Sequence, residues 1–500
     1  MGSPGIGAAG GTPRRTRRRR MLTIAPLAVL AVGAAVLTGC DDINTVARPD
    51  APLVLTGADL PGLVGTAPGD IVAFRHRWVN DAPEWQQVPV QVDERKVVGF
   101  GQFPANNTTP GVAGTVYGNG TGSVTALQYA DANTFVGADS NAAFDADDEL
   151  VFMVADAGGK ARAGEAAAPA GVVPGSGVAV QLDDPLGDDD QGWMYLFKST
   201  TLDPAAGKDY VDYDFALTSG NYKTTYRRNT GPNPETSSVT TANYRIGYSD
   251  RWYEDDWRIT AGGASGVDVL DGIKNRFALS TCGRSNLTFA TAEGAFVANI
   301  DGPVRGIRSY VGANSGPLTQ RTHLMYRDRE DVVTDLRVHA IPGIMGHTDL
   351  SAAARGMTYR NSTATGGVAV DGNPDAIGTT VPQWHLTTGP QGSIMEADAL
   401  DTTIIPAGGT IDDVADGFYI DDDDTTVDQC WGDPDFLGTH GTSFVTAIPN
   451  TDPAAGTAAT FRAYGSTRFA APGATAEQAA TWATAWRTPL QTSVAAWPAG

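Results

Sequence analysis

The sequence predicts an all-β protein, either one large β-sandwich or two packed β-sandwich domains. Three observations carry this prediction. The 500 residues include 60 glycines and 30 prolines, which favour turns over long helices. Apolar runs have the length of strands, and turn-forming residues separate them about every eight to twelve positions. The hydrophobic content of 41% is enough for a core, and the length exceeds what one ordinary core needs.

The first forty residues have the pattern of an export signal. Six arginines lie within residues 14–20, and an apolar stretch follows from Met21 to Leu37. That stretch is shorter than the ~20 residues that a membrane-spanning helix needs. It ends in Leu37-Thr38-Gly39-Cys40, which resembles a bacterial lipobox. The resemblance implies a signal helix within residues 1–40 and a lipid on Cys40 that anchors the mature protein to a membrane.

Two other interpretations of this segment stay open, an ordinary signal peptide with a chance cysteine and an uncleaved anchor. Residues 18–22 also resemble a twin-arginine signal, so the export route is not predicted. We expect residues 41–52 to be a tether and the body to lie in the bacterial cell envelope, outside the cytoplasm. The formal net charge of −22 argues against nucleic acid as a partner. The oligomeric state is not predicted.

Two cysteines remain when Cys40 carries a lipid, namely Cys282 and Cys430. An even pair in an oxidising compartment favours a disulfide. Such a bridge would close a loop of about 150 residues and stabilise the fold by ~4–5 kcal/mol. Two buried free thiols are the alternative, because the sequence does not place the two Cα atoms within reach of each other.

An N-terminal β domain is predicted over residues 53–200. Within it, residues 88–94 alternate between apolar and polar, and Pro89 suits an edge strand. Residues 158–177 are rich in alanine, glycine and proline and are predicted to be an exposed connection. The predicted strands of this domain are residues 70–78, 88–94, 149–155, 178–182 and 193–197.

A C-terminal β-sandwich domain is predicted over residues 201–500. Residues 476–486 are rich in alanine with spaced apolar positions, which predicts one short C-terminal helix. The predicted strands of this domain are residues 209–215, 244–247, 276–280, 287–290, 304–311, 321–326 and 335–341.

Acidic residues gather in three clusters, at 145–149, 183–190 and 421–424. Ca²⁺ takes several oxygen ligands, and closely spaced aspartates in loops can supply them. If one cluster binds Ca²⁺, we expect Asp145, Asp147 and Glu149 to be the ligands. Leu150 stands where an EF-hand loop has its turn glycine, so that pattern is absent. A solvated acidic surface is the alternative.

Four of the six histidines lie between residues 323 and 385. Residues 321–327 and 335–339 are predicted strands joined by the polar loop 328–331. A hairpin centred near Asp331 would place His323 opposite His339, with Arg321 and Arg337 on the same face. These four residues are the predicted catalytic group, since they could supply a general base and anion clamps for a uronic acid or similar substrate. A solvated face is the alternative, and a register slip of one residue would break the pairing.

The absence of several common motifs limits the classes of catalytic site that the sequence predicts. No tightly spaced histidine or cysteine pair predicts zinc, and the sequence has no glycine-rich phosphate loop, serine-hydrolase elbow or haem site. Residues 251–257 interleave aromatics with acids, as sugar-binding platforms do. Core tryptophans flanked by surface charge are the alternative for that segment.

Three short segments, residues 88–93, 147–152 and 302–317, resemble parts of uncharacterised secreted bacterial proteins. More distantly they resemble galactose-mutarotase-like β-supersandwich proteins, which often handle carbohydrates. The resemblance implies a supersandwich fold and a carbohydrate ligand, and it assigns no catalytic residue.

Three functional hypotheses remain. The first is a lipid-anchored protein that binds or processes extracellular carbohydrate such as polysaccharide. The second is a non-catalytic structural or assembly lipoprotein of the envelope, and the sequence does not decide whether the chain is an enzyme. The third, a metal-dependent hydrolase, requires histidines to converge on a carboxylate.

Overall fold

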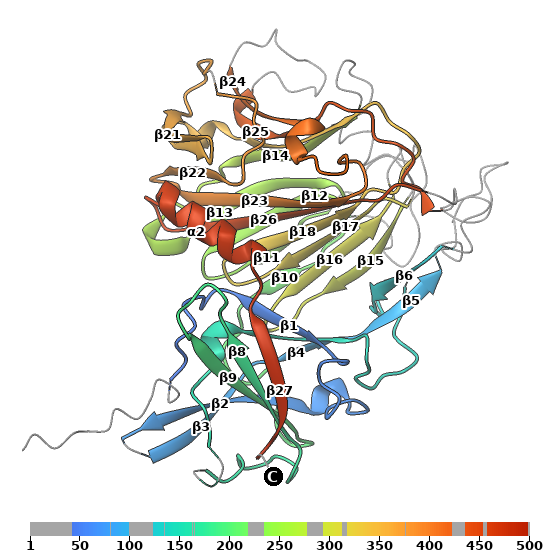
Figure 1. Cartoon of the computed structure of the whole chain (residues 1–500), viewed down its shortest axis with the longest axis vertical. Coiled ribbons are helices and arrows are strands. Elements are labelled where there is room, and N and C mark those ends of the chain that lie inside the picture. The colour runs from blue at the N-terminus through green and yellow to red at the C-terminus, as the bar shows by residue number, and fades with distance from the viewer. Residues whose placement is uncertain are drawn as a thin grey trace, which may run out of the picture. The chain divides into compact units, whose positions relative to one another are not determined.

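Strands make up nearly all of the regular structure, which confirms the predicted all-β class (Figure 1). Among the residues described, no helix is long and apolar enough to cross a membrane. The computed structural model describes residues 43–80, 82–99, 124–134, 136–162, 164, 166–218, 235–277, 294–312, 318–375, 377–422, 436–453 and 458–498. The signal segment, Cys40 and the predicted disulfide partners Cys282 and Cys430 therefore lie outside the described residues.

The N-terminal part of the chain builds three antiparallel sheets. Alternation explains their cores: in β8, Val178, Val180 and Leu182 are buried and face the apolar core around Ile71 and Leu196. One sheet has the order β1 (Pro52–Thr56), β7 (Glu149–Met153), β4 (Gln91–Asp93). The second has the order β27 (Gln491–Trp497), β8 (Gly177–Asp183), β9 (Gln191–Lys198), β2 (Ile71–Val79), β3 (Ala82–Val88). The third pairs β5 (Arg95–Gly99) with β6 (Thr125–Tyr129).

Two predicted strands of this part end differently in the structure. The predicted strand 88–94 divides into β3 and β4, because Pro89 has no N–H and the next amide, Val90, donates to Pro204 instead of to a strand. The predicted strand 149–155 stops at Met153, and the chain turns through η5 (Val154–Asp156).

The second half of the chain builds the larger sheets. One has the order β10 (Asp212–Asp214), β11 (Ser237–Thr240), β12 (Tyr244–Asp250), β13 (Tyr253–Ile259). Another has the order β14 (Leu270–Phe277), β19 (Ile344–Leu350), β25 (Phe436–Phe444), β24 (Ala415–Asp422). The largest has nine strands, in the order β15 (Ala295–Ile300), β16 (Gly306–Val311), β17 (Gln320–Met325), β18 (Arg329–Asp335), β26 (Phe461–Ala470), β23 (Gly392–Thr402), β22 (His385–Gly389), β20 (Thr358–Asn361), β21 (Ala364–Ala369).

The predicted C-terminal helix is confirmed as α2 (Ala476–Arg487). Thr475 and Gln478 cap its first turn reciprocally, each side chain bonding the other's backbone N–H. Its apolar side, with Trp482 at the centre, packs on β22 and β23, and Figure 1 shows it lying along that sheet. Short 3-10 turns lie at η2 (Pro68–Asp70), η6 (Ala261–Gly263), η7 (Ala352–Ala354) and η8 (Ile411–Asp413).

After α2 the chain returns to the N-terminal sheets, where β27 pairs with β8 in register from Gln491↔Asp183 to Trp497↔Gly177 (Figure 1). The sequence did not predict β27, because this edge strand is mostly exposed and lacks a continuous apolar face. By its internal contacts, Cys40–Gly500 forms one compact unit. The predicted division near residue 200 stays a prediction.

The three segments that carried the sequence resemblance meet at one buried guanidinium. Arg305 donates to the Asp93 carboxylate from Nε and Nη2 at 2.9 and 2.6 Å, and to Glu149 from Nη2 at 2.6 Å. The Gln91 side chain accepts from the backbone N–H of Arg305 and donates to Asp93. This network ties β4 and β7 to the segment that precedes β16.

Candidate functional site

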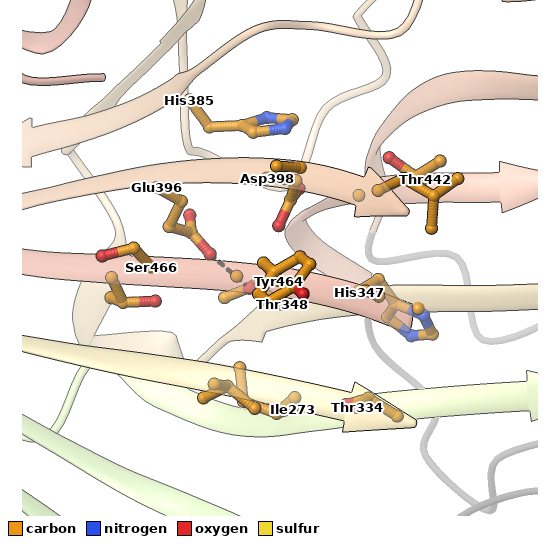
Figure 2. A pocket seen from close by; sticks show the side chains of 18 of the residues that line it. Ile273, Thr334, His347, Thr348, His385, Glu396, Asp398, Thr442, Tyr464 and Ser466 are labelled. Atoms are coloured by element: carbon orange, nitrogen blue, oxygen red, sulfur yellow. Dashed lines mark hydrogen bonds between the residues drawn. The ribbon is translucent and has the colours of Figure 1, made fainter. Parts of the chain in front are cut away.

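A cavity of about 640 Å³ lies between the nine-stranded sheet and the sheet of β14, β19, β25 and β24 (Figure 2). Residues on β17, β18, β26 and β23 form one wall, and residues on β14, β19 and β25 form the other. The volume is that of an ordinary small-molecule site, about 300–1,000 Å³. Its titratable lining residues are Glu254, Arg321, His323, Glu330, His347, His385, Glu396, Asp398, His440, Tyr464 and Arg487.

Alternation along β23 decides which side chains reach the cavity. Glu396 and Asp398 point into it from the same strand (Figure 2). Met395 and Ala397 point to the opposite face and pack against α2. The two acids therefore stand about 7 Å apart along one strand, on one face of the sheet.

Glu396 pairs with His440 from the facing sheet. His440 Nε2 lies 2.6 Å from Glu396 Oε2, and His440 Nδ1 lies 2.8 Å from the carbonyl oxygen of Gly438. Since both partners are acceptors, the doubly protonated imidazolium satisfies both. Burial alone would lower the pKa of His440, but the Glu396 carboxylate outweighs it and raises that pKa. Burial would raise the pKa of Glu396, yet His440 and a hydrogen bond from Thr348 lower it to about 2.

A chain of hydrogen bonds fixes the tautomer of His385. The Asn361 Oδ1 atom accepts from the backbone N–H groups of Thr363 and Ala364, so Asn361 Nδ2 donates to the Tyr359 hydroxyl at 3.3 Å. Tyr359 in turn donates to His385 Nδ1 at 2.7 Å. The ring hydrogen of His385 therefore sits on Nε2. Burial lowers the pKa of His385 to about 3, so the ring is neutral near pH 7.

Asp398 is a cavity carboxyl that combines a raised pKa with an exposed side chain, whereas Glu254 and Glu330 are buried. The Asp398 side chain is exposed to the cavity. Desolvation by the surrounding protein nevertheless raises its pKa to about 6, and the negative charge of Glu396 adds to this rise. Arg487, at the end of α2, opposes the shift and donates to the Asp398 backbone carbonyl at 2.6 Å. A carboxyl with a pKa near the working pH can act as a general acid or base.

A second cluster of titratable side chains, formed by Glu254, His323 and Glu330, lines another part of the same cavity. His323 Nδ1 is 2.9 Å from Glu330 Oε1 and 3.8 Å from Glu254 Oε2. All three side chains are buried and line the cavity. Burial raises the pKa of Glu254 to about 8 and that of Glu330 to about 7, and it lowers the pKa of His323 to about 3.

The predicted hairpin forms with a different register. In the β17–β18 pair, His323 lies opposite Val332 and Arg321 opposite Thr334, so the prediction that His323 faces His339 is wrong. The turn falls at Arg327-Asp328, between the Tyr326 N–H and the Arg329 carbonyl oxygen that it bonds. The prediction of a loop over residues 328–331, made from their charge, is wrong for residues 329–331, which lie in β18.

Partners elsewhere in the fold explain why these charges are in a strand. Glu330 accepts from the Tyr248 hydroxyl at 2.8 Å, Asp331 accepts from Ser466 at 2.5 Å, and Arg329 donates to Asp331 at 2.9 Å. Of the predicted strand 335–341, only Asp335 lies in β18, as the last residue of that strand.

Two of the four predicted catalytic residues line the cavity, Arg321 and His323. Arg321 donates to Asn275 at 3.3 Å and stacks its guanidinium over Trp252. Arg337 donates to the Leu318 carbonyl, and His339 is exposed. Neither Arg337 nor His339 is among the cavity's lining residues.

The structure brings two of the predicted calcium ligands together, since the Asp145 and Asp147 side chains are hydrogen-bonded to each other, but it does not gather all three. Glu149 is ion-paired with Arg95 and Arg305, whereas Asp145 accepts from Asn141 and from the backbone N–H of Asp147. Among the described residues, the one set of three or more ligand atoms within 4.8 Å of one another is Glu254, His323 and Glu330. Calcium binding stays a prediction.

The two tryptophans of the segment 251–257 belong to the core. Trp252 is buried and donates to the Gly312 carbonyl at 2.9 Å, and Trp257 is buried and donates to Glu254 at 2.5 Å. An exposed aromatic platform is therefore not formed by these two tryptophans.

Sequence reasoning did not single out Glu396, Asp398 or His440. A signal was present in residues 392–400, where two acids at alternate positions interrupt an otherwise apolar strand. Acids that alternate with buried apolar residues indicate a polar face inside the protein. His440 gave no such signal, because its partner lies 44 residues away.

No family model matches the chain, and no curated protein matches its sequence. A solved structure from Escherichia coli K12, described as a "Putative aldose 1-epimerase", is similar to part of it. The match has 11% sequence identity and a TM-score of 0.27, and it covers 46% of this chain and 97% of the other. A likeness this distant carries no argument about the present site.

Proposed function

We propose that this chain binds a carbohydrate in the cavity between the two sheets and processes it by general acid–base chemistry. The observation that carries the proposal is the Asp398 carboxyl, which faces the cavity with its pKa raised to about 6. The neutral His385 ring and the His440–Glu396 pair line the same cavity. Proton transfer by a positioned group of matched pKa accelerates reactions about 10²–10⁴-fold.

Each of these groups has a distinct role in the proposal. Asp398 exchanges a proton with a substrate oxygen, and the Nε2–H of His385 donates a hydrogen bond to another oxygen. The His440–Glu396 pair holds a fixed positive and a fixed negative charge at the wall, where charge developing on the substrate would meet it.

The rest of the lining suits a sugar. Hydroxyl groups both donate and accept hydrogen bonds, and Thr348, Thr442 and Ser466 line the cavity beside the charged groups (Figure 2). Apolar side chains such as Phe444 and Phe461 offer surface for the C–H face of a sugar ring.

The test is a binding and turnover screen of the purified protein against polysaccharides and their oligosaccharides, with and without Ca²⁺. Asp398→Asn removes the titrating proton at nearly constant volume, and we expect turnover to fall about 10²-fold or more while binding persists. His339→Ala is the matched control, because His339 is exposed and does not line the cavity. Saccharide turnover unchanged in Asp398→Asn, or no binding across the panel, would leave the non-catalytic lipoprotein as the better account.

We propose further that this activity takes place outside the cytoplasm, on a protein held to the membrane by a lipid on Cys40. The lipobox-like Leu37-Thr38-Gly39-Cys40 supports this location. Metabolic labelling of a bacterial host with an alkyne fatty acid should label the wild type and not Cys40→Ala. Equal labelling of the two proteins would contradict the anchor.

A further inference from the structure

We propose that Glu254, His323 and Glu330 form a binding site for a divalent transition-metal ion, with Zn²⁺ as the best-fitting member of the class. One ligand atom from each residue lies within 4.8 Å of the others, and all three side chains are buried. The site goes beyond the proposed carbohydrate chemistry, because metal binding can be measured with no saccharide present.

The spacing suits a small ion. In a tetrahedral zinc site with bonds near 2.1 Å, neighbouring ligand atoms stand about 3.4 Å apart. The distances from His323 Nδ1, 2.9 Å to Glu330 and 3.8 Å to Glu254, bracket that value. Adjustments of about half an ångström in side chains would bring all three to bonding distance.

Neighbouring groups already orient each ligand. Trp257 Nε1 donates to Glu254 Oε1 at 2.5 Å, which leaves Oε2 facing His323. The Tyr248 hydroxyl donates to Glu330 at 2.8 Å. Such outer partners fix ligand geometry and are worth about 10–100-fold in metal affinity.

Tyr310 can support the His323 tautomer that a metal needs. Its hydroxyl lies 3.1 Å from His323 Nε2. Because a hydroxyl can accept as well as donate, Tyr310 can accept an Nε2–H and leave the Nδ1 lone pair free for the ion.

Ligand type selects the class of ion. One imidazole and two carboxylates suit Zn²⁺, Co²⁺ or Mn²⁺, whereas Ca²⁺ and Mg²⁺ prefer oxygen ligands alone. Two carboxylates also balance the ion's charge. The nearby Arg308 is already neutralised by Glu235, with which it makes two hydrogen bonds of 2.9 and 2.7 Å. All three ligands line the cavity, so an ion held by them would lie next to the space where a cavity ligand would bind.

The experiment is a titration of the chelator-treated protein with Zn²⁺ by calorimetry and with Co²⁺ by visible absorption. We expect one site per chain and a Co²⁺ spectrum of low coordination number. Glu254→Gln keeps the volume of the side chain and an acceptor for Trp257, and it should weaken binding at least about 100-fold. Tyr310→Phe tests the orienting hydroxyl and should weaken binding about 10-fold or more.

Two controls separate this site from surface binding. His339→Ala removes an exposed histidine, and Glu84→Gln changes an exposed acid outside every candidate site, so both should bind like the wild type. Circular dichroism checks that each variant is folded. Stoichiometric binding that survives in Glu254→Gln, or no binding by the folded wild type, overturns the site. Either result leaves the saccharide screen unaffected, because that screen depends on Asp398.

Discussion

The chain buries charge in two regions that behave differently. Around Arg305, the carboxylates of Asp93 and Glu149 surround the guanidinium, which is 1% exposed. At the cavity wall, the His440–Glu396 pair is similarly buried, but Asp398 beside it faces open space. Both regions contain ions in ordinary hydrogen-bonded geometry. Burial of charge therefore does not mark a functional site by itself, whereas a polar group turned toward a cavity beside such a pair does.

The Arg305 network should give the largest effect on stability. Arg305→Met would leave Asp93 and Glu149 buried without their common partner, at a cost of about 3–5 kcal/mol in the free energy of unfolding. Denaturant unfolding measures it. Arg77→Ala is the matched control, since Arg77 and its partner Glu84 are 43% and 44% exposed, and it should cost no more than about 1 kcal/mol. Equal losses in the two variants would remove the distinction between sealed and exposed pairs.

The His440–Glu396 pair should have a smaller and pH-dependent effect on the free energy of unfolding. The pKa of Glu396 is below its ordinary 4.5, so its stabilisation is complete above pH 4.5 and is lost as the pH falls through about 2. The pKa of His440 is above its ordinary 6.5, so its stabilisation is complete below pH 6.5 and is lost as the pH rises through the raised value. The pair therefore stabilises the fold most between pH 4.5 and 6.5.

Glu396→Gln tests that window. It should cost about 2–3 kcal/mol near pH 5.5, and clearly less near about pH 2, where the wild-type carboxylate is itself becoming protonated. Glu84→Gln, which changes an exposed acid, should show a small difference at both pH values. A cost for Glu396→Gln that is the same at every pH would mean that the side chain acts by packing and not by charge.

Local sequence patterns predicted the strands and the helix in which one face of the element is buried. Alternating apolar residues predicted β8, and the alanine-rich run predicted α2, because burial of one face determines both elements. The segment 329–331 was misread because its charges are satisfied by Tyr248 and Ser466, which are distant in sequence. A propensity for loops was overridden by partners that only the folded sheet supplies.

The candidate site was less predictable than the fold, for the same physical reason. Two of the predicted residues, Arg321 and His323, line the cavity because they alternate on β17. The His440–Glu396 pair joins two different sheets, so no spacing in the sequence foretells it. His323, Glu254 and Glu330 likewise come from β17, β13 and β18, which is why the search for tight metal-ligand spacing found nothing.

Asp398→Asn should give the smallest stability change, with the opposite sign. Because desolvation by the surrounding protein and the nearby Glu396 charge raise the pKa of Asp398 from its ordinary 3.8 to about 6, the folded state binds its proton more tightly than the unfolded state does. Stability therefore falls as the pH rises through that interval, and the ionised carboxylate is a mild burden at neutral pH. Asparagine does not ionise, so we expect the melting temperature near pH 7 to rise by about 1–3 °C. The gain should vanish near about pH 4, where the wild-type side chain is protonated in the fold.

A variant that loses saccharide turnover while it gains stability would show that Asp398 is held in place for function, unlike the residues around Arg305. A loss of stability at pH 7 would instead mean that Asp398 stabilises the fold. Asp398 would then have a structural role, as the buried residues around Arg305 do.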